Sequence, residues 1–267
     1  MKTTSTIDLT NSEYRSINAW SNSDLSNINK GAAIVEWNKN TTRTEDSEAA
    51  IIGTATHSAL LEPDLFAVEY VKMPDFDMRT NAGKASAESF KSNMKDKIVL
   101  SSGDYDLVIG MRDSMLAHPI INKLLTSPGQ SEVSIFFEVD GVKCKARPDR
   151  IVDPSVFDQH IIVDVKTSAD VDKFVRSVRD YRYHCQDAFY SDAYKKLTGF
   201  KPRFLFAVVG KNKVFGKHPA RLFELDSDSK DEGRMQYIED IEKVKEYDGF
   251  GIGSLETEII SLPKKWN

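Results

Sequence analysis

Apolar and polar residues alternate along the middle of the chain, a pattern typical of strands that bury one face. From Val133 to Val139 every second residue is apolar, and Asp140-Gly141 follows directly. An Asp-Gly pair after such a segment is a strong signal for a tight β-hairpin, so residues 142–151 are expected to return as its second strand. Residues 161–166 are mostly apolar on both faces, which predicts a central strand of a sheet.

Helical patterns surround this β-rich region. Capping residues and turn residues predict helices that begin near Ser23 and that cover residues 49–61, 83–95, 104–117, 120–125, 167–197 and 229–246. Strands are also expected over residues 66–73, 204–209 and 221–225, the last of them at an edge, and a turn over residues 249–253. The alternation of strands and helices favours an α/β fold with a central mixed sheet flanked by helices.

The length of 267 residues allows one large domain or two small ones. Residues 1–20 are rich in Thr, Ser and Asn, and we interpret them as a mobile or docking arm. No internal repeat or clear break follows, so residues 21–267 are expected to form a single domain.

Composition narrows the class of protein. Hydrophobic residues make up 40% and charged residues 29%, which is ordinary for a globular protein, and no apolar run is long enough for a membrane span. The polar N-terminus shows no signal peptide, and the two cysteines, Cys144 and Cys185, are expected to be buried free thiols. A cytoplasmic location is therefore expected.

The net charge of −5 argues only weakly against nucleic-acid binding, because a basic groove can coexist with an acidic outer surface.

The strongest chemical signal is Arg147-Pro-Asp149, followed fifteen residues later by Asp164-Val-Lys166. Side chains at i and i+2 of a strand point to the same face, so Asp164 and Lys166 are expected side by side. Strand pairing would bring Asp149 next to them. Two carboxylates and one ammonium group at one point are costly unless they have a use, and holding a divalent cation beside an attacking water is such a use.

Further residues are weaker candidates. Glu132 could supply a carboxylate for a second metal ion, or be a solvated residue at a strand end. His57 lies among apolar residues of a helix and is as consistent with a core histidine as with a metal ligand. Gln186 and Tyr190 are four residues apart on one helix face, where they could hold a phosphate or a base, or simply pack. Arg179 and Arg182 could contact the DNA backbone or be solvated.

Several motifs in order resemble one branch of the nucleases. The Pro-Asp and Asp-x-Lys elements are similar to the PD-(D/E)XK nuclease superfamily. The resemblance to the nuclease domain of the RecE (exodeoxyribonuclease VIII) family rests on His57-Ser-Ala-Leu-Leu-Glu-Pro63, Arg79-Thr-Asn-Ala-Gly-Lys84, Arg147-Pro-Asp149, Val163-Asp-Val-Lys-Thr167, Tyr181-Arg-Tyr-His-Cys-Gln-Asp-Ala-Phe-Tyr190-Ser-Asp192 and Ser261-Leu-Pro263.

The resemblance implies a restriction-endonuclease-like core and a 5′→3′ exonuclease on linear double-stranded DNA. Such an enzyme depends on Mg²⁺, with two ions expected and Mn²⁺ as a substitute, and leaves 3′ single-stranded tails for recombination by a RecT-like annealing protein. The catalytic set that it implies is Asp149, Asp164, Lys166, Glu132, His57, Gln186 and Tyr190. The metal-ligand set is Asp149, Asp164, Glu132, His57 and Val165. A ring-shaped homo-oligomer, a trimer or tetramer, is also implied.

Other possibilities stay open at this point. Arg79 and Lys84 precede or begin a helix, and we expect them to bind a terminal 5′-phosphate, because a helix N-terminus suits an anion. A structure-specific nuclease or an endonuclease with the same core is one alternative. A non-catalytic DNA-binding protein that keeps the fold is another, and the intact Asp149, Asp164 and Lys166 argue against it.

Overall fold

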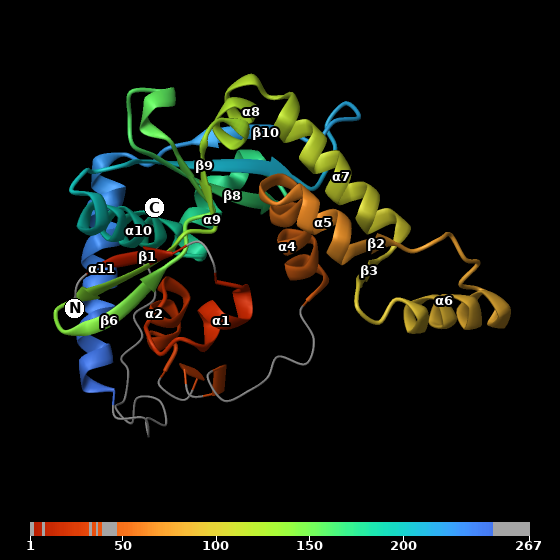
Figure 1. Cartoon of the computed structure of the whole chain (residues 1–267), viewed down its shortest axis with the longest axis horizontal. Helices are drawn as coiled ribbons and strands as arrows, with labels where there is room; N and C mark the ends of the chain where they lie inside the picture. Colours follow the sequence, from red (N-terminus) through yellow and green to blue (C-terminus); the bar gives the residue numbers. More distant parts are fainter. Residues whose placement is uncertain (1–2, 7–8, 32–33, 36, 39–46, 248–267) are drawn as a thin grey trace, which may run out of the picture.

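The computed structural model describes residues 3–6, 9–31, 34–35, 37–38 and 47–247 (Figure 1). The expected turn at residues 249–253 and the Ser261-Leu-Pro263 motif lie outside these residues. No helix in the described ranges combines the length and apolar character that a membrane span requires.

The central sheet has five strands, in the order β10-β9-β8-β7-β4. Its middle strand, β8 (Ile161–Ser168), pairs in parallel with β9 (Arg203–Gly210) and antiparallel with β7 (Arg150–Val152). The edges are β4 (Gly129–Ser131) and β10 (Ala220–Phe223). The prediction of a mixed sheet with 161–166 at its centre is therefore confirmed.

The predicted hairpin forms a separate sheet beside the first. Its strands, β5 (Ser134–Val139) and β6 (Val142–Ala146), meet at Asp140 and Gly141, whose φ angles of 47° and 84° are those of a tight hairpin turn. A third strand, β1 (Thr4–Thr6), pairs antiparallel with β5, and the helix α1 (Asn11–Ser16) follows. The described part of the first twenty residues is thus docked on the protein.

A small parallel pair, β2 (Tyr70–Lys72) and β3 (Ile98–Leu100), carries the α6 region. In Figure 1, α6 extends away from the rest of the molecule. The helices are α2 (Asn22–Ile28), α4 (Glu48–Leu61), α5 (Pro63–Glu69), α6 (Asn81–Asn93), α7 (Ser102–Ala117), α8 (Pro119–Thr126), α9 (Phe174–Asp180), α10 (Tyr183–Thr198) and α11 (Ser227–Glu246), with short 3₁₀ turns at Pro154–Val156 and Val171–Lys173.

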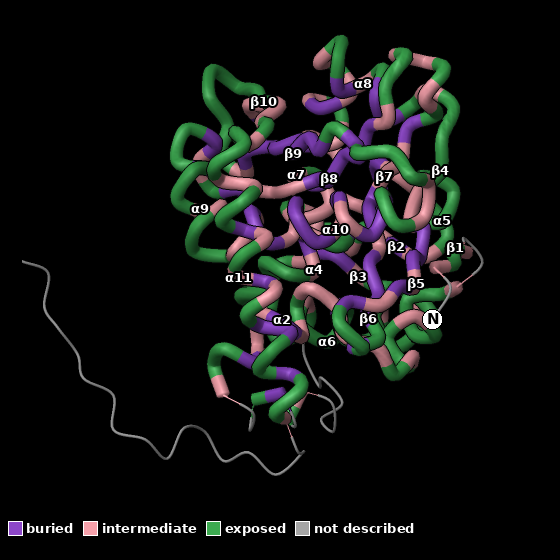
Figure 2. Tube along the Cα trace, turned by 90° about the vertical axis from the view of Figure 1, so that its left-hand side faces the viewer, coloured by how far each residue is buried: buried purple, intermediate pink, exposed green. Residues whose placement is uncertain are grey.

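The two faces of β8 are covered by different helices. Val163 and Val165 point into a core shared with α4 and α7, whereas Ile162 on the other face packs with α9 and α10. The buried residues in Figure 2 accordingly concentrate along β7, β8 and β9. Cys144 and Cys185 are buried free thiols, as predicted. The strand that carries the candidate chemistry is thus held rigidly from both sides.

Three sequence predictions are wrong. The second hairpin strand, expected over residues 142–151, ends at Ala146, and residues 150–152 form β7 of the central sheet instead. Residues 66–73 do not form one strand, because Pro63 starts a new helix at its first turn, where a proline fits without losing a hydrogen bond, and only residues 70–72 are extended. The long helix predicted over 167–197 is divided into α9 and α10. Arg182 adopts the left-handed conformation (φ 55°, ψ 41°), which ends one helix and begins the next.

Candidate active site

Strand pairing brings the Pro-Asp and Asp-x-Lys elements together, as their sequence pattern predicted. Arg150 is paired with Val163, so Asp149 lies beside the end of β8 that carries Asp164 and Lys166. The backbone N–H of Val165 donates to Asp149 Oδ2 at 2.7 Å. This bond fixes the Asp149 carboxylate against the strand.

Asp164 is fully buried and is held by two partners. Its Oδ1 accepts a hydrogen bond from Gln186 Nε2 of α10 at 2.8 Å. Its Oδ2 is in ion-pair contact with Lys166 Nζ but accepts no hydrogen bond within the described residues. A hydrogen bond from Gln186 therefore fixes Oδ1 of Asp164, whereas Oδ2 has only the charge of Lys166 beside it.

Burial sets the protonation of this cluster. It raises the pKa of Asp164 to about 6, against the opposite effect of Lys166. Burial also raises the pKa of Asp149. For Lys166, burial lowers the pKa, but Asp164 and Asp149 outweigh it and the net shift is upward. The lysine therefore stays charged, and its charge holds the two acids together.

Glu132 approaches from the residues before β5. Its backbone is left-handed (φ 53°), and its N–H donates to the Asp149 carbonyl at 3.1 Å. Its Oε2 lies 3.2 Å from Arg147 Nε. Burial, followed by the charge of Asp149, raises the pKa of Glu132 to about 8. A third carboxylate thus belongs electrostatically to the same cluster.

His57 reaches the site from α4, on the opposite side from α10. Its Nδ1 lies 3.4 Å from Asp149 Oδ2. Burial and then the charge of Lys166 lower the pKa of His57 to about 4, so it is a neutral imidazole at pH 7. A neutral imidazole has a lone pair available for a metal ion.

The side chains of this cluster are of the types that bind a divalent cation, but they are not yet spaced as a set of metal ligands. Carboxylate oxygens are the ligands that Mg²⁺ prefers, and the pKa values of Glu132 and Asp164 are raised by burial first and by the charge of Asp149 to a smaller extent. Asp164 Oδ2 is a buried acceptor without a hydrogen bond. In the described part of the chain, however, no three His, Cys, Asp or Glu side chains already converge as a ligand cluster. The residue types therefore fit a metal, and binding would require Lys166 to share Asp164 with it.

A groove of about 1090 Å³ lies next to the residues that surround this cluster. Gln186 and Tyr190 line it on the α10 side, and the N-terminal segment that includes Tyr14 lines the other. Gln186 connects the groove to the cluster, because it lines the groove and also donates to Asp164. Its volume is at the upper limit of ordinary small-molecule pockets, about 300–1,000 Å³.

Four residues whose contacts shape the site were not predicted in these roles. Lys145 Nζ donates to the carbonyls of Tyr14, Arg15 and Ile17. Arg147 donates to the carbonyls of Glu132 and Leu9 and lies over the Tyr14 ring. The ring of Tyr183 lies 4.7 Å from Lys166 Nζ. The four residues are Tyr14, Lys145, Arg147 and Tyr183. Of these, only Arg147 had a sequence signal for such a role, because it directly precedes the Pro-Asp pair.

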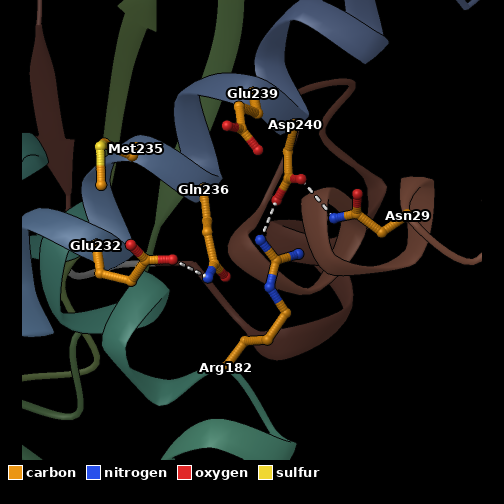
Figure 3. Close-up of a pocket in the computed structure, with 7 residues that line it drawn as sticks. All are labelled: Asn29, Arg182, Glu232, Met235, Gln236, Glu239 and Asp240. Atoms are coloured by element: carbon orange, nitrogen blue, oxygen red, sulfur yellow. Dashed lines mark hydrogen bonds and ion pairs between the residues drawn. The ribbon is translucent and has the colours of Figure 1, made fainter. Parts of the chain in front are cut away.

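The four predicted DNA-contact residues do not gather at the cluster. Arg79 and Lys84 lie in the α6 region, with Arg79 paired to Asp77 and almost fully exposed. Arg179 is exposed beside Asp180. Figure 3 shows that Arg182 points instead toward Asp240, with which it forms a 2.8 Å ion pair in a pocket of about 380 Å³. Arg182 therefore has a structural partner, and the roles of the other three stay predictions.

A mixed sheet whose central strand carries Asp-x-Lys beside a Pro-Asp turn, covered by helices on both faces, defines a PD-(D/E)XK nuclease fold. Residues 21–249 match the family described as "PDDEXK-like domain of unknown function (DUF3799)", and the chain belongs to this family.

A solved structure agrees on the fold. A protein from Eubacterium rectale, described as a "Putative exonuclease", aligns with a TM-score of 0.61 and 17% identity, covering 91% of this chain and 88% of that one. A second structure, of the protein SSO0001, has a TM-score of 0.28 and 15% identity over 69% of this chain and 84% of its own, which is too low to support an argument. No curated protein matches the sequence.

Proposed function

We propose that the protein is a metal-dependent exodeoxyribonuclease that degrades one strand of linear double-stranded DNA in the 5′→3′ direction. The observation that carries the proposal is the convergence of Asp149, Asp164 and Lys166 at the end of β8, with Gln186 fixing Asp164. In a PD-(D/E)XK fold these residue types serve phosphodiester hydrolysis. The groove beside them is large enough for a polymeric substrate to enter.

Asp149, Asp164, Glu132 and His57 would hold the cation, with Val165 supplying a backbone atom. Two ions are proposed, Mg²⁺ or in its place Mn²⁺, and their chemistry when bound would be to polarise the phosphate and lower the pKa of a bound water. The imidazole of His57 suits Mn²⁺ better than Mg²⁺.

The side chains of the chain itself have separable roles. Lys166 places a positive charge where negative charge develops on the phosphate during attack. Gln186 keeps Asp164 oriented by its 2.8 Å hydrogen bond. Tyr183 packs against Lys166 Nζ and limits where the ammonium group can move. Tyr190 and Gln186 line the groove by which the strand approaches.

Direction, product and partners rest on the RecE-type motifs. They support release of nucleotides from 5′ ends, 3′ single-stranded tails as product, and a RecT-like annealing protein that uses those tails. The description of the Eubacterium rectale neighbour supports exonuclease activity. We also propose a ring of three or four copies around the DNA, because encirclement would let an acidic protein keep its substrate with less electrostatic affinity.

The test uses linear duplex DNA labelled at the 5′ or the 3′ end, incubated with Mg²⁺. Wild type should release the 5′ label first, as mononucleotide, and Lys166→Ala should release neither label. Lys201→Ala is the matched control, because Lys201 is an exposed lysine outside the cluster.

Three results would change or remove the proposal. Release of the 3′ label first would reverse the direction. Cutting of covalently closed circles would favour the alternative, an endonuclease or structure-specific nuclease with the same core. No cleavage of any DNA with Mg²⁺ or Mn²⁺ would remove the proposal altogether.

A further inference from the structure

A basic hairpin with an aromatic tip projects from the end of the central sheet. It connects β9 to β10 and has the sequence Lys211-Asn-Lys-Val-Phe-Gly-Lys217. Val214 and Lys217 exchange two backbone hydrogen bonds, of 2.8 and 3.1 Å, so Phe215 and Gly216 form a two-residue turn. Phe215 is fully exposed and Val214 is about half exposed.

The tip holds Phe215 in an unfavourable backbone conformation. Its φ angle is 48°, followed by 79° at Gly216, which is the pattern of a type I′ turn. Asn, Asp and Gly are preferred at the first of these positions, and a bulky residue there costs on the order of 1 kcal/mol or more. A strained aromatic ring that packs on nothing does not stabilise the fold, which points to a role outside it.

The base of the hairpin, in contrast, is tightly anchored. Lys211 N–H donates to the Ser168 carbonyl at 2.7 Å, and Asn212 Nδ2 donates to the Ala169 carbonyl at 3.0 Å. A Cβ at Gly210 would lie 2.8 Å from Pro219 Cγ, so the two arms meet too closely for a side chain there. Ser168 is the last residue of the catalytic strand β8, and Ala169 follows it directly.

This anchoring places the hairpin at the same end of the sheet as the candidate active site. Lys166 is two residues before Ser168 on β8, and Ser168 is paired with Gly210 on β9. In Figure 1 the connection between β9 and β10 extends beyond the arrowhead of β9. Phe215 is five positions after Gly210, an extended reach of about 17 Å.

The charge of the hairpin is opposite to that of the whole chain. It contains three lysines and no acid within seven residues, while the chain carries a net charge of −5. Within the part of the chain that the structure describes, Lys211, Lys213 and Lys217 form no ion pair, so their charges are available to a partner. A partner that offers both flat apolar rings and negative charges at close spacing fits this tip.

We propose that the basic hairpin binds single-stranded DNA beside the active site, with Phe215 stacked on a base and the lysines against phosphates. The inference rests on the proposed function for its substrate. Exposed aromatic rings bind single strands by stacking on bases, and each such contact contributes about 1–3 kcal/mol. Bases within a duplex are covered by their neighbours, so an unpaired strand is the form that offers its rings to the tip.

Binding is measured by fluorescence anisotropy of a labelled single-stranded oligonucleotide in EDTA, so that cleavage does not enter. Phe215→Gly removes the ring and also relieves the turn, so the variant should fold, and its affinity should be about tenfold weaker. Phe215→Trp should restore binding. Phe200→Ala, at another exposed phenylalanine, is the matched control and should bind as wild type does.

The lysines are tested by the dependence of affinity on salt. Lys213→Glu should weaken binding. It should also reduce the slope of log affinity against log salt concentration by about one unit or less, which is the contribution of one phosphate contact. Lys201→Glu makes the same charge change at an exposed lysine just before β9, whose other end carries the hairpin, and should leave that slope unchanged.

Three outcomes would overturn the proposal. Unchanged single-strand affinity in Phe215→Gly would show that the ring does not stack. An equal loss on blunt duplex lacking any single strand would assign the tip to duplex ends. A lower oligomeric mass with unchanged DNA affinity would assign it to a contact between copies of the chain. Because cleavage of duplex DNA with Mg²⁺ is measured separately, normal cleavage alongside any of these results would leave the proposed function standing.

Discussion

Two buried acid–cation pairs lie on either side of the start of α10, and they are built differently. In the active-site candidate, Asp164 is in contact with Lys166, and in the pocket of Figure 3, Asp240 is paired with Arg182. Asp240 is 2% exposed and Asp164 fully buried, so burial alone does not distinguish them. The distinction lies in what the second oxygen of each acid contacts.

The Asp240 carboxylate has a partner from another element on each oxygen, although Arg182 Nη1 has no hydrogen bond in the described residues, and we call this pair closed. The Asp164 pair we call open. One oxygen of Asp240 accepts from Asn29 Nδ2 and the other lies 2.8 Å from Arg182, so three elements of the fold meet there. Asp164 Oδ2 has the charge of Lys166 beside it and no hydrogen bond in the described residues. The closed pair holds neighbouring helices together, whereas the open pair leaves Asp164 Oδ2 as an acceptor for a ligand. The difference predicts that breaking the Arg182–Asp240 pair lowers stability and that breaking the Lys166–Asp164 pair lowers activity.

The largest effect is expected from Lys166→Ala, which removes the charge of the open pair. The rate of DNA cleavage should fall at least about 10³-fold, because a group that stabilises developing charge typically contributes that much. The free energy of unfolding should fall by less than in Arg182→Ala, because burial already raises the pKa values of Asp164 and Asp149 and the acids can take up a proton once the lysine is gone. The measurement is cleavage of end-labelled duplex beside a urea titration. A loss of folding as large as that of Arg182→Ala would show that the Asp164 pair is structural as well.

Arg182→Ala is the converse change. It leaves the Asp240 carboxylate buried without its charge partner and should lower the free energy of unfolding by about 3 kcal/mol. Cleavage by the folded fraction should remain within a few-fold of wild type. Asp240→Asn is the control, because it removes the buried negative charge and keeps an acceptor for one of the two donors, and it should destabilise less. Equal stability of Arg182→Ala and wild type would contradict the structural role.

These two pairs also show how far the sequence could be followed. The Asp164–Lys166 contact was predictable because residues at i and i+2 of a strand share a face, and Asp149 could be placed because a short connection joins paired strands. The Arg182 pair was not, since Asn29 and Asp240 are more than 200 positions apart. The left-handed conformation of Arg182, which divides the predicted long helix, leaves no trace in helical periodicity.

The same reasoning applies to the groove. Its α10 wall was predicted, because Gln186 and Tyr190 are four residues apart on one face. Its other wall was not, since residues 1–20 have only a polar composition to distinguish them. The wall exists because Lys145 and Arg147 bind backbone carbonyls of that segment, and a backbone carbonyl carries no sequence signal.

A pH-dependent effect of intermediate size is expected one residue beyond Gln186. Burial raises the pKa of Asp187 to about 7, against the opposite effect of Lys230, and its Oδ2 accepts no hydrogen bond in the described residues. A pKa raised in the folded protein means that folding is favoured while the acid is protonated. This contribution is full below pH 3.8, the usual pKa, and is lost as pH rises through about 7.

Asp187→Asn removes this titration. At pH 8 the variant should be more stable than wild type by about 2 kcal/mol, and at pH 4 the difference should vanish. Urea unfolding of both proteins between pH 4 and 8 measures it. A constant difference across that range would mean that the substitution acts by packing and that Asp187 does not take up a proton on folding.

The smallest expected effect concerns the aromatic neighbour of the open pair. The Tyr183 ring lies 4.7 Å from Lys166 Nζ, and a cation–π contact that is partly shielded from water contributes about 0.5–2 kcal/mol. Tyr183→Leu should therefore lower the cleavage rate about threefold to thirtyfold at unchanged DNA affinity, because the ammonium group is less well held. Tyr183→Phe keeps the ring and should retain nearly full activity. If Tyr183→Phe is as impaired as Tyr183→Leu, the hydroxyl group and not the ring is what supports cleavage. Tyr183 would then act by a hydrogen bond to the substrate and not by its contact with the Lys166 ammonium group.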